Sequence, residues 1–484
     1  MDTVETGVPG LDVILAGGLP RGALVLVTGP SGAGKTILAT QVLFHHARAG
    51  RRVLVLTLLT EASSKLIAHL AGLEYFDAAL LGDRVRILNI QQLLEGKGLD
   101  ATLAEILQLV VADRIELLLI ESVHSLYALI ADGSAVQRFI FRLGSTMFQV
   151  GCTTLMVTDR DPTDGGASLE AVISDVTLKL EVSVADKRER RELRVVKERG
   201  APPLTGQHAY TVTGAGVRVY PRIESRAVAA RMPETGGRLG WGLASLDRLT
   251  GGGIPRHDAT LVLGTAGLGK TTLALHFVAE GVARGERCLY LVFHETEGRL
   301  LRKAAGFGLP LRAAIEAGSL RFASVPPAAL DVDGVLNWAL EEVAERAVSR
   351  VVIDTLNPLE RVASREGRFP EVLAALLHLL QAGGATTLIT RELTQVVGQG
   401  LDLGDAHEAY WTPFDNIVLL RPVELAGAVA RLLSVLKMRS SAHGQAFYRF
   451  GIGAAGIEIG EPLAGLAGLL TGLPRRADGG AVGG

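Results

Sequence analysis

The sequence of 484 residues predicts an α/β protein of two tandem domains, each with a mostly parallel sheet flanked by helices. Three observations lead to this fold class. A glycine-rich segment of the form G-x-x-x-x-G-K-[ST] occurs twice, at residues 29–36 and 264–271. Short apolar runs alternate with longer helical patterns in both halves, which is typical of parallel sheets with crossover helices. The sequence around the two segments also keeps a constant spacing, because Lys35 and Lys270 are 235 residues apart.

The repeat begins before the glycine-rich segments. Residues 7–21 and 242–256 share the pattern G-x-x-x-L-D-x-x-x-x-G-G-[LI]-P-R. In each copy an apolar run follows, at 23–27 and 260–263, and a helical pattern comes after the glycine-rich segment. This order of strand, loop and helix separates a nucleotide-binding loop from a chance match.

Two further strands are expected in each copy. Residues 50–56 and 285–291 keep the same spacing and contain the second strand. The third strand is expected at 116–120 in the first copy and at 350–353 in the second. Each copy therefore has the rhythm of a parallel sheet flanked by helices.

Changes in composition set the expected domain boundaries. Residues 222–237 are rich in Arg, Glu, Pro and Gly and lack apolar periodicity, as linkers do. We expect a first domain at 1–224, a linker at 225–237, a second domain at 238–460 and a flexible tail at 461–484. The apolar, glycine-laced part of this tail is either flexible or a docking segment for a protein partner or a neighbouring subunit.

The composition argues against several classes of protein. Lys plus Arg (49) nearly balances Asp plus Glu (51), so a nucleic acid or an anionic membrane is not the expected partner. The N-terminal residues lack the features of a signal peptide, and no stretch reaches the roughly 18 apolar residues of a membrane span. Cys152 and Cys288 lie in apolar runs and fit neither a disulfide framework nor a zinc site. We expect a cytoplasmic protein.

The two glycine-rich segments are expected to bind the phosphates of ATP. Glycines let backbone N–H groups converge on a phosphate, and the helix that follows adds the positive end of its dipole. The lysines should reach the β- and γ-phosphates, and Thr36 and Thr271 should hold Mg²⁺. The expected ATP-binding residues are Gly29, Ser31, Gly32, Ala33, Gly34, Lys35 and Thr36 in the first loop and Gly264, Ala266, Gly267, Leu268, Gly269, Lys270, Thr271 and Thr272 in the second.

Hydrolysis also requires an acid at the end of the third strand, which supports Mg²⁺. Asp354 is this acid in the second copy, and Glu121 is its counterpart in the first. Glutamate keeps the charge but adds a methylene, which moves the carboxylate by about 1.5 Å, and positioning on that scale affects the rate. The second copy is therefore the better equipped for catalysis.

The repeated opening pattern, the two phosphate loops and Lys437-Met438-Arg439 resemble the KaiC family of double-domain RecA-like P-loop ATPases. The resemblance covers essentially the whole chain, and it includes residues 470–476 (L-T-G-L-P-R-R), which are similar to tails in that family. It implies a ring of identical subunits, usually a hexamer with two stacked tiers, in which ATP lies between adjacent subunits.

KaiC-like proteins usually carry two adjacent glutamates after the second strand, one of which orients or activates the nucleophile. The resemblance puts His294 and Glu295 at these positions in the second copy and Leu59 and Thr60 in the first. Glu61 lies one residue beyond and faces the opposite side of an extended backbone unless the loop slips by one residue. Glu295 is therefore the expected catalytic carboxylate. His294 is either a water ligand or an ordinary loop histidine.

The resemblance also implies residues that act on the ATP of a neighbouring subunit. A Lys-x-Arg near the end of each KaiC-like domain reaches the γ-phosphate of the neighbour, as an arginine finger does. In this chain these residues are Lys197 and Arg199 in the first copy and Lys437 and Arg439 in the second. His443 follows the second pair at the spacing of the family, whereas the first copy has Pro203 there.

One feature of the family is not carried over. The protein that names the family phosphorylates an adjacent Ser-Thr pair in its second domain, and the equivalent stretch here begins Trp411-Thr412-Pro413. Because the tryptophan replaces one hydroxyl, a two-site phosphorylation cycle is not expected. Thr412 is either a single acceptor, in which case the protein has serine/threonine autokinase activity, or an ordinary turn threonine.

The sequence thus predicts a slowly hydrolysing ring ATPase of the KaiC-like signalling or timing class. The first domain is expected mainly to bind ATP and hold subunits together, and the second to turn ATP over. Two alternatives remain open: a RecA- or DnaB-like DNA-dependent ATPase, and an ATP-sensing scaffold that hydrolyses in neither domain. The first alternative lacks an evident basic loop with aromatic residues, which proteins that bind single strands use.

Overall fold

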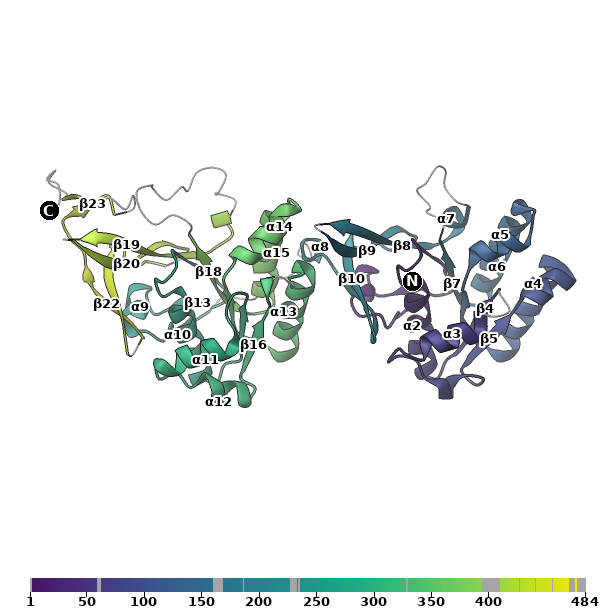
Figure 1. Ribbon diagram of the computed structural model, residues 1–484, viewed down its shortest axis with the longest axis horizontal. Coiled ribbons are helices and arrows are strands. Elements are labelled where there is room, and N and C mark those ends of the chain that lie inside the picture. The colour runs from purple at the N-terminus through teal and green to yellow at the C-terminus, as the bar shows by residue number, and fades with distance from the viewer. Residues whose placement is uncertain are drawn as a thin grey trace. The chain divides into compact units, whose positions relative to one another are not determined.

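The computed structural model describes residues 2–58, 62–159, 169–185, 187–226, 233, 236–327, 330–393, 410–425, 427–439, 441–454, 456–469 and 475–476. The chain divides into two compact units, Met1–Ser225 and Arg226–Gly484. Figure 1 shows the helices and strands of both. Within the described ranges, no helix has the length and apolar character needed to traverse a lipid bilayer.

In the described part of the first unit, nine strands form one sheet. The strands of the unit are β1 (Thr3–Val4), β2 (Leu19–Pro20), β3 (Leu24–Thr28), β4 (Arg52–Thr57), β5 (Val85–Asn89), β6 (Ile115–Ile120), β7 (Thr153–Thr158), β8 (Val176–Ala185), β9 (Arg188–Glu198), β10 (His208–Thr213) and β11 (Gly216–Tyr220). The sheet order is β11-β10-β9-β8-β3-β7-β6-β4-β5. The strands from β8 to β5 in this order are parallel, and β9 to β11 extend the edge as antiparallel strands.

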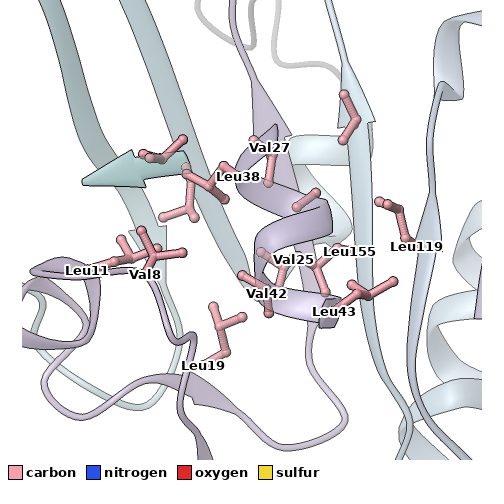
Figure 2. Packing of buried hydrophobic residues seen from close by; sticks show 14 of the residues in the cluster. Val8, Leu11, Leu19, Val25, Val27, Leu38, Val42, Leu43, Leu119 and Leu155 are labelled. Atoms are coloured by element: carbon pink, nitrogen blue, oxygen red, sulfur yellow. The ribbon is translucent and has the colours of Figure 1, made fainter. Parts of the chain in front are cut away.

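Helices cover both faces of this sheet, as expected where successive strand residues point to opposite sides. Val25 and Val27 face one apolar cluster, and Leu24 and Leu26 face another. Figure 2 shows the first cluster, in which the helix after the phosphate loop packs against the sheet. The helical segments are α1 (Leu11–Ile14), α2 (Lys35–Arg48), α3 (Ala62–Leu70), the 3₁₀ turn η1 (Ala78–Leu80), α4 (Gln91–Asp113), α5 (Val123–Leu129), α6 (Gly133–Gln149), α7 (Leu169–Ile173) and α8 (Ile223–Arg226).

The packing of α2 positions the phosphate loop. Leu38, Val42 and Leu43 of this helix are buried against the strands. Each such side chain contributes roughly 1.5–3 kcal/mol by leaving water. The N-terminus of α2 is therefore held at the carboxyl end of β3, where ligands bind in parallel α/β sheets.

The second unit repeats this topology, with β14 in the place of β3 and the order β22-β21-β20-β19-β14-β18-β17-β15-β16. Its strands are β12 (Arg238–Leu239), β13 (Ile254–Pro255), β14 (Ala259–Gly264), β15 (Cys288–Val292), β16 (Leu320–Ser324), β17 (Arg350–Asp354), β18 (Thr386–Glu392), β19 (Asn416–Leu425), β20 (Ala428–Met438), β21 (Tyr448–Gly453), β22 (Gly456–Pro462), β23 (Leu466–Ala467) and β24 (Arg475–Arg476). Its helices are α9 (Ala244–Leu249), α10 (Lys270–Ala283), α11 (Glu297–Gly306), α12 (Leu311–Glu316), α13 (Val332–Arg346), α14 (Asn357–Arg365) and α15 (Phe369–Ala382). The predicted fold class, two tandem RecA-like α/β domains, is confirmed.

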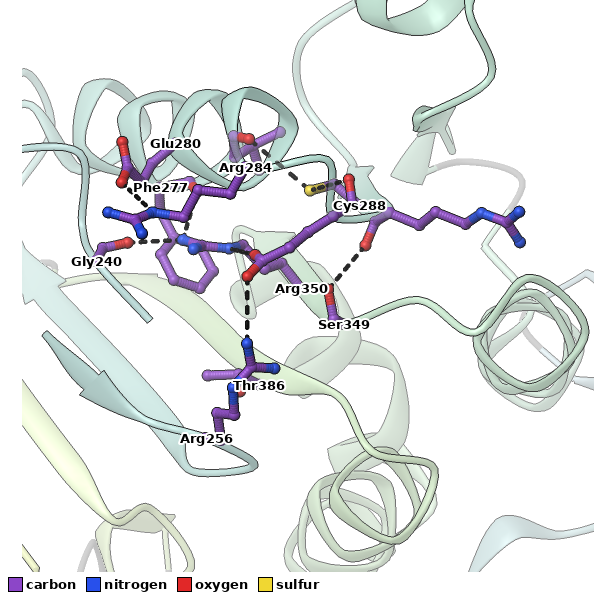
Figure 3. A network of polar contacts seen from close by, with 12 residues as sticks. Gly240, Arg256, Phe277, Glu280, Arg284, Cys288, Ser349, Arg350 and Thr386 are labelled. Atoms are coloured by element: carbon purple, nitrogen blue, oxygen red, sulfur yellow. Dashed lines mark hydrogen bonds and ion pairs between the residues drawn. The ribbon is translucent and has the colours of Figure 1, made fainter. Parts of the chain in front are cut away.

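The units differ at the start of the strand that carries the expected Mg²⁺-binding acid. Arg350 begins β17 and is fully buried, whereas the register puts Leu117 at this position in the first unit. Arg350 forms an ion pair with Glu286 and donates to the backbone oxygens of Gly240 (2.6 Å) and Phe277 (2.9 Å). Figure 3 shows this network. A buried charge of this kind depends on its partner, because its desolvation is otherwise uncompensated.

The end of the second unit packs on its own sheet. Leu469 is buried in a cluster with Val423 and Leu432, which Leu463 and Leu466 also join. β23 pairs with β24. Residues 470–474 and 477–484 lie outside the described residues, as does most of the expected linker. The expected boundaries and the flexible or docking role of the tail therefore stay predictions.

Candidate active site

Each phosphate loop joins the central strand of its sheet to the following helix. The first loop connects β3 to α2, and the second connects β14 to α10. Gly34 and Gly269, the residues before the helices, have φ of 92° and 96°, a region that residues other than glycine rarely adopt. At Gly29 a Cβ would lie 2.2 Å from the backbone oxygen of Leu180, which leaves no room for a side chain. The loop backbone therefore requires glycine at these positions.

The two loop lysines are held in the same way. Lys35 and Lys270 are buried, with 7% and 8% of their surface exposed. Each donates from Nζ to the two backbone oxygens that begin its loop, at 2.8 Å in all four cases. Burial lowers the pKa of Lys270, against the opposing effect of nearby carboxylates. The two ammonium groups thus have equivalent places in their loops, and their contact with the phosphates of a nucleotide remains a prediction.

A pocket of about 390 Å³ adjoins the first loop. Its walls include the acids Glu121 and Asp159 and a further cation, Arg191. Arg191 donates to the backbone oxygen of Gly32 at 2.9 Å, which holds the guanidinium against the loop. A pocket of this size, lined by Lys35 and Arg191, has the volume and the positive charge to accept a phosphate chain.

Asp159 pairs directly with the first loop lysine. Its Oδ1 lies 2.5 Å from Nζ of Lys35. The sheet register puts Glu392 at the equivalent position of the second unit. In the part of the chain that the structure describes, no ion pair within 4 Å reaches Lys270. The two lysines therefore differ in the charge that they have available for a phosphate.

Asp354, at the end of β17, is fixed through both carboxylate oxygens. Tyr290 donates its hydroxyl to Oδ2 at 2.8 Å, and Thr390 donates to Oδ1 at 2.5 Å. Burial, together with the charge of Asp354, holds the pKa of Tyr290 well above its ordinary value, so the tyrosine remains a donor. The carboxylate is therefore held in one orientation.

Glu121 follows β6 at the equivalent place, but its carboxylate is not held. The residues at the positions of Tyr290 and Thr390 are Val55 and Val157. Among the described residues, no hydrogen bond or ion pair reaches the Glu121 side chain. Burial raises the pKa of this carboxyl, which disfavours the charged form that a metal ion needs.

The segment that leads to Glu295 begins beside Asp354. The N–H of Phe293 donates to the backbone oxygen of Asp354 at 3.3 Å, so the segment after β15 runs beside the end of β17. The carboxylate of Glu295 is 3.7 Å from the guanidinium of Arg299. The corresponding residues 59–61 lie outside the described residues, so the expectation for Glu61 is neither supported nor opposed.

The four expected trans-acting residues bind their own unit. Lys197 and Arg199 donate to backbone oxygens at the end of α7, and Lys437 and Arg439 donate to the equivalent oxygens before β19. Each arginine also pairs with the aspartate that precedes β8 or β19, at 3.5 and 3.4 Å. Their contact with a neighbouring subunit remains a prediction.

Glu198, which lies between Lys197 and Arg199, has no acidic counterpart in the second unit. Both carboxylate oxygens of Glu198 are buried and lack a hydrogen-bond partner among the described residues. Burial raises the pKa of Glu198 to about 7. The register of β9 and β20 puts Met438, which is buried, at the same position in the second unit. A site suited to an apolar side chain thus holds a carboxyl group in the first unit.

Thr412 is exposed beside the buried Trp411. Arg391 lies over the indole ring, 5.3 Å from its centroid. The backbone oxygen of Thr412 accepts a hydrogen bond from Arg439 at 2.9 Å. These contacts explain the tryptophan as a packing residue, and they leave phosphorylation of Thr412 a prediction.

A family model described as "ATPase: KaiC" matches residues 4–224 and 240–464, which include both phosphate loops and both Lys-x-Arg pairs. The chain belongs to the KaiC family of ATPases. Among similar proteins, a circadian clock protein KaiC3 of Synechocystis sp. is 29% identical, with 98% of this chain and 95% of the relative covered. The circadian clock oscillator proteins KaiC of Parathermosynechococcus lividus and Synechococcus elongatus are 27% and 28% identical, with 98% of this chain and 88% and 92% of the relatives covered.

Membership supports ATP binding and ATPase activity in a protein with two tandem domains. The resemblance inferred from the sequence is thereby confirmed.

Four residues of the two sites were not expected from the sequence: Asp159, Arg191, Tyr290 and Thr390. A comparison at constant spacing contains a signal for Tyr290, because a hydroxyl-bearing residue in an apolar strand stands opposite Val55. The others depend on which strands are neighbours and in which register. That information is absent from the two phosphate loops alone.

The donor set of the second site fits Mg²⁺. This ion prefers oxygen ligands and is usually bound by one or two carboxylates together with substrate phosphates. Asp354 offers a carboxylate held by two hydroxyl donors, and Thr271 offers a hydroxyl in the first turn of α10. Mg²⁺ held by these residues would supply positive charge to the phosphates of ATP. In the first unit the corresponding groups are Thr36 and Glu121.

Proposed function

We propose that the protein is a slow, Mg²⁺-dependent ring ATPase of the KaiC-like signalling or timing class. Both domains bind ATP, and the second domain carries out most of the hydrolysis. The proposal rests on membership of the KaiC ATPase family and on the unequal equipment of the two sites.

The observation that carries the proposal is the difference between Asp354 and Glu121, the acids expected to bind Mg²⁺ in the two domains. Asp354 accepts a hydrogen bond on each carboxylate oxygen. In the first unit, valines replace both of the residues that would donate such bonds to Glu121. A carboxylate that is already oriented needs less reorganisation when Mg·ATP binds. The second site is therefore the better prepared for phosphoryl transfer to water.

Each residue of the second site has a proposed role. Lys270 binds the β- and γ-phosphates, and Thr271 and Asp354 hold Mg²⁺. Glu295 orients the attacking water. Lys437 and Arg439 come from the neighbouring subunit and stabilise charge on the γ-phosphate.

The proposed ring is a homohexamer in the cytoplasm. In the first domain, Lys35 and Thr36 bind ATP, while Lys197 and Arg199 contact it from the adjacent subunit. Because this nucleotide is touched from both sides and turned over slowly, it holds the ring together. The tail at 461–484 is the proposed site for a protein partner, through the residues beyond Leu469, which itself packs on the sheet.

Matched glutamine variants test the asymmetry. Glu295→Gln should lower steady-state ATPase activity by roughly 10²-fold, the usual contribution of a positioned acid or base. Glu121→Gln should lower it much less. A larger loss in Glu121→Gln than in Glu295→Gln contradicts the proposal.

Further measurements separate the alternatives. Activity equal to that of a Lys35→Ala/Lys270→Ala double variant indicates a scaffold that does not hydrolyse ATP. Salt-sensitive binding of single-stranded DNA with stimulated turnover indicates a DNA-dependent ATPase. Mass spectrometry after incubation with ATP decides whether Thr412 is phosphorylated.

A further inference from the structure

The carboxylate of Asp354 is clamped from both sides within the sheet. β17 lies between β15 and β18, and each neighbour contributes one hydroxyl to the carboxylate at its end. Tyr290 of β15 donates to Oδ2 at 2.8 Å, and Thr390 of β18 donates to Oδ1 at 2.5 Å. Because a carboxylate oxygen has two lone pairs, each oxygen can still accept from a water bound to a metal ion.

Both donors are held rigidly. Tyr290 is fully buried, and its ring stacks on Phe322 with centroids 4.7 Å apart and planes at 16°. Thr390 is also fully buried, and its backbone oxygen accepts bonds from the N–H of Leu356 (2.8 Å) and the hydroxyl of Thr355 (3.0 Å). The two hydroxyls therefore have little freedom to leave the carboxylate.

The first unit shows that the fold does not need these hydroxyls. Its register puts Val55 and Val157 at the two donor positions, and both lie in a sheet of the same topology. Burying a tyrosine hydroxyl in a strand is costly unless it has a partner. Strand formation therefore does not explain why the second unit has hydroxyls at these two positions. The hydrogen bonds that both hydroxyls donate to the Asp354 carboxylate do explain it.

We propose that Tyr290 and Thr390 are positioning residues that orient the Asp354 carboxylate toward the Mg²⁺ of bound Mg·ATP. Groups that hydrogen-bond a metal-binding carboxylate fix its direction, and their loss typically costs 10–100-fold in metal affinity or activity. This inference deepens the proposed function, because it explains why the second domain is the main site of hydrolysis.

Manganese binding tests the inference without relying on turnover. Mn²⁺ replaces Mg²⁺ and is titrated by electron paramagnetic resonance into full-length protein loaded with a non-hydrolysable ATP analogue. A Lys35→Ala background removes the phosphate-binding lysine of the first domain. Tyr290→Phe, which keeps the stacked ring, should weaken Mn²⁺ binding about 10-fold, and Thr390→Val should act in the same direction.

Two further variants give the test its controls. Thr390→Ser restores a hydroxyl donor and should recover most of the Mn²⁺ affinity. Tyr127→Phe removes a tyrosine hydroxyl that binds the carboxylate of Glu170, away from the phosphate pocket, and should leave Mn²⁺ binding unchanged. Wild-type affinity in both Tyr290→Phe and Thr390→Val overturns the inference, as does equal weakening in Tyr127→Phe.

The inference and the proposed function fail in different experiments. Full ATPase activity in Glu295→Gln contradicts hydrolysis in the second domain, whatever the Mn²⁺ affinities are. Unchanged Mn²⁺ affinity in the clamp variants contradicts the positioning role even if Glu295→Gln is inactive.

Discussion

The carboxylate of Asp159 lies 2.5 Å from the ammonium group of Lys35 in the first phosphate loop. The lysine is buried and already donates to two backbone oxygens, so the aspartate uses its remaining donor. In the proposed function, ATP displaces this carboxylate when its phosphates bind the lysine. The equivalent Glu392 is not within ion-pair distance of Lys270 in the described structure.

Asp159→Asn should therefore raise the affinity of the first domain for ATP. An ion pair with one exposed partner is worth about 0.2–1 kcal/mol, so the expected gain is up to about fivefold. Titration of a fluorescent ATP analogue in a Lys270→Ala background measures it. The Lys35→Ala/Asp159→Asn double variant is the control and should show no gain over Lys35→Ala. Weaker binding in Asp159→Asn would mean that the carboxylate contacts the bound metal or nucleotide instead.

Glu198 should make the stability of the first unit fall as pH rises. Its pKa is raised from an ordinary value of about 4.5 to about 7, so between these values the folded chain keeps a proton that the unfolded chain loses. The lost stability is at most about 3 kcal/mol above pH 7. Glu198→Met, which copies Met438, should remove this dependence and stabilise the unit most at pH 8.

Urea unfolding at pH 4.5, 6 and 8 measures this effect. All three tryptophans (Trp241, Trp338 and Trp411) lie in the second unit, so tryptophan fluorescence reports the unfolding of that unit. Circular dichroism reports both units. The circular-dichroism transition that has no counterpart in the fluorescence curve therefore belongs to the first unit. Met438→Leu is the control and should leave the pH dependence unchanged. An identical pH profile for wild type and Glu198→Met would show that the carboxyl is solvated in solution.

Removing one partner of the Arg350–Glu286 ion pair should destabilise the second unit strongly, whereas replacing both partners by apolar residues should destabilise it little. Glu286→Ala leaves the fully buried guanidinium without its ion pair and should cost about 3 kcal/mol in the second unit. Arg350→Leu/Glu286→Ala introduces the residue that the first unit has at Leu117 and should recover most of the loss. Tryptophan fluorescence during urea unfolding reports the second unit directly. A double variant as unstable as Glu286→Ala would show that the arginine contributes mainly through its hydrogen bonds to Gly240 and Phe277.

The fold was predictable because its signals are local. The strand expected at 116–120 is β6 (Ile115–Ile120), which begins one residue earlier, and the apolar run at 23–27 corresponds to β3 (Leu24–Thr28), which is displaced by one residue. Apolar runs indicate buried strands, and the spacing of glycines indicates the phosphate loops. The antiparallel extension of each sheet has no such local signature, because its strands mix charged and apolar residues, as β9 does.

The candidate site was predictable only in part, for a related reason. Asp354 follows an apolar strand, so its position at the edge of the sheet could be inferred. The donors that hold it lie 64 and 36 residues away in sequence and meet it through strand order and register. Register places the two hydroxyls on one carboxylate, and a one-residue slip would turn both to the opposite face.

Subunit mixing tests the proposed trans action of Arg439. Within one chain, Arg439 donates to the backbone oxygen of Thr412. ATPase activity should therefore depend on this arginine only if it reaches the ATP site of a neighbouring subunit. Glu295→Gln subunits keep the arginine, and Arg439→Ala subunits keep the glutamate. In a one-to-one mixed ring about a quarter of the interfaces join an intact glutamate to an intact arginine of the adjacent subunit, so activity should recover to about a quarter of wild type. If the arginine acts within its own chain, every site lacks one group and the mixture stays inactive. Arg194→Ala, which removes an exposed arginine of β9, is the control and should retain full activity both alone and in mixtures.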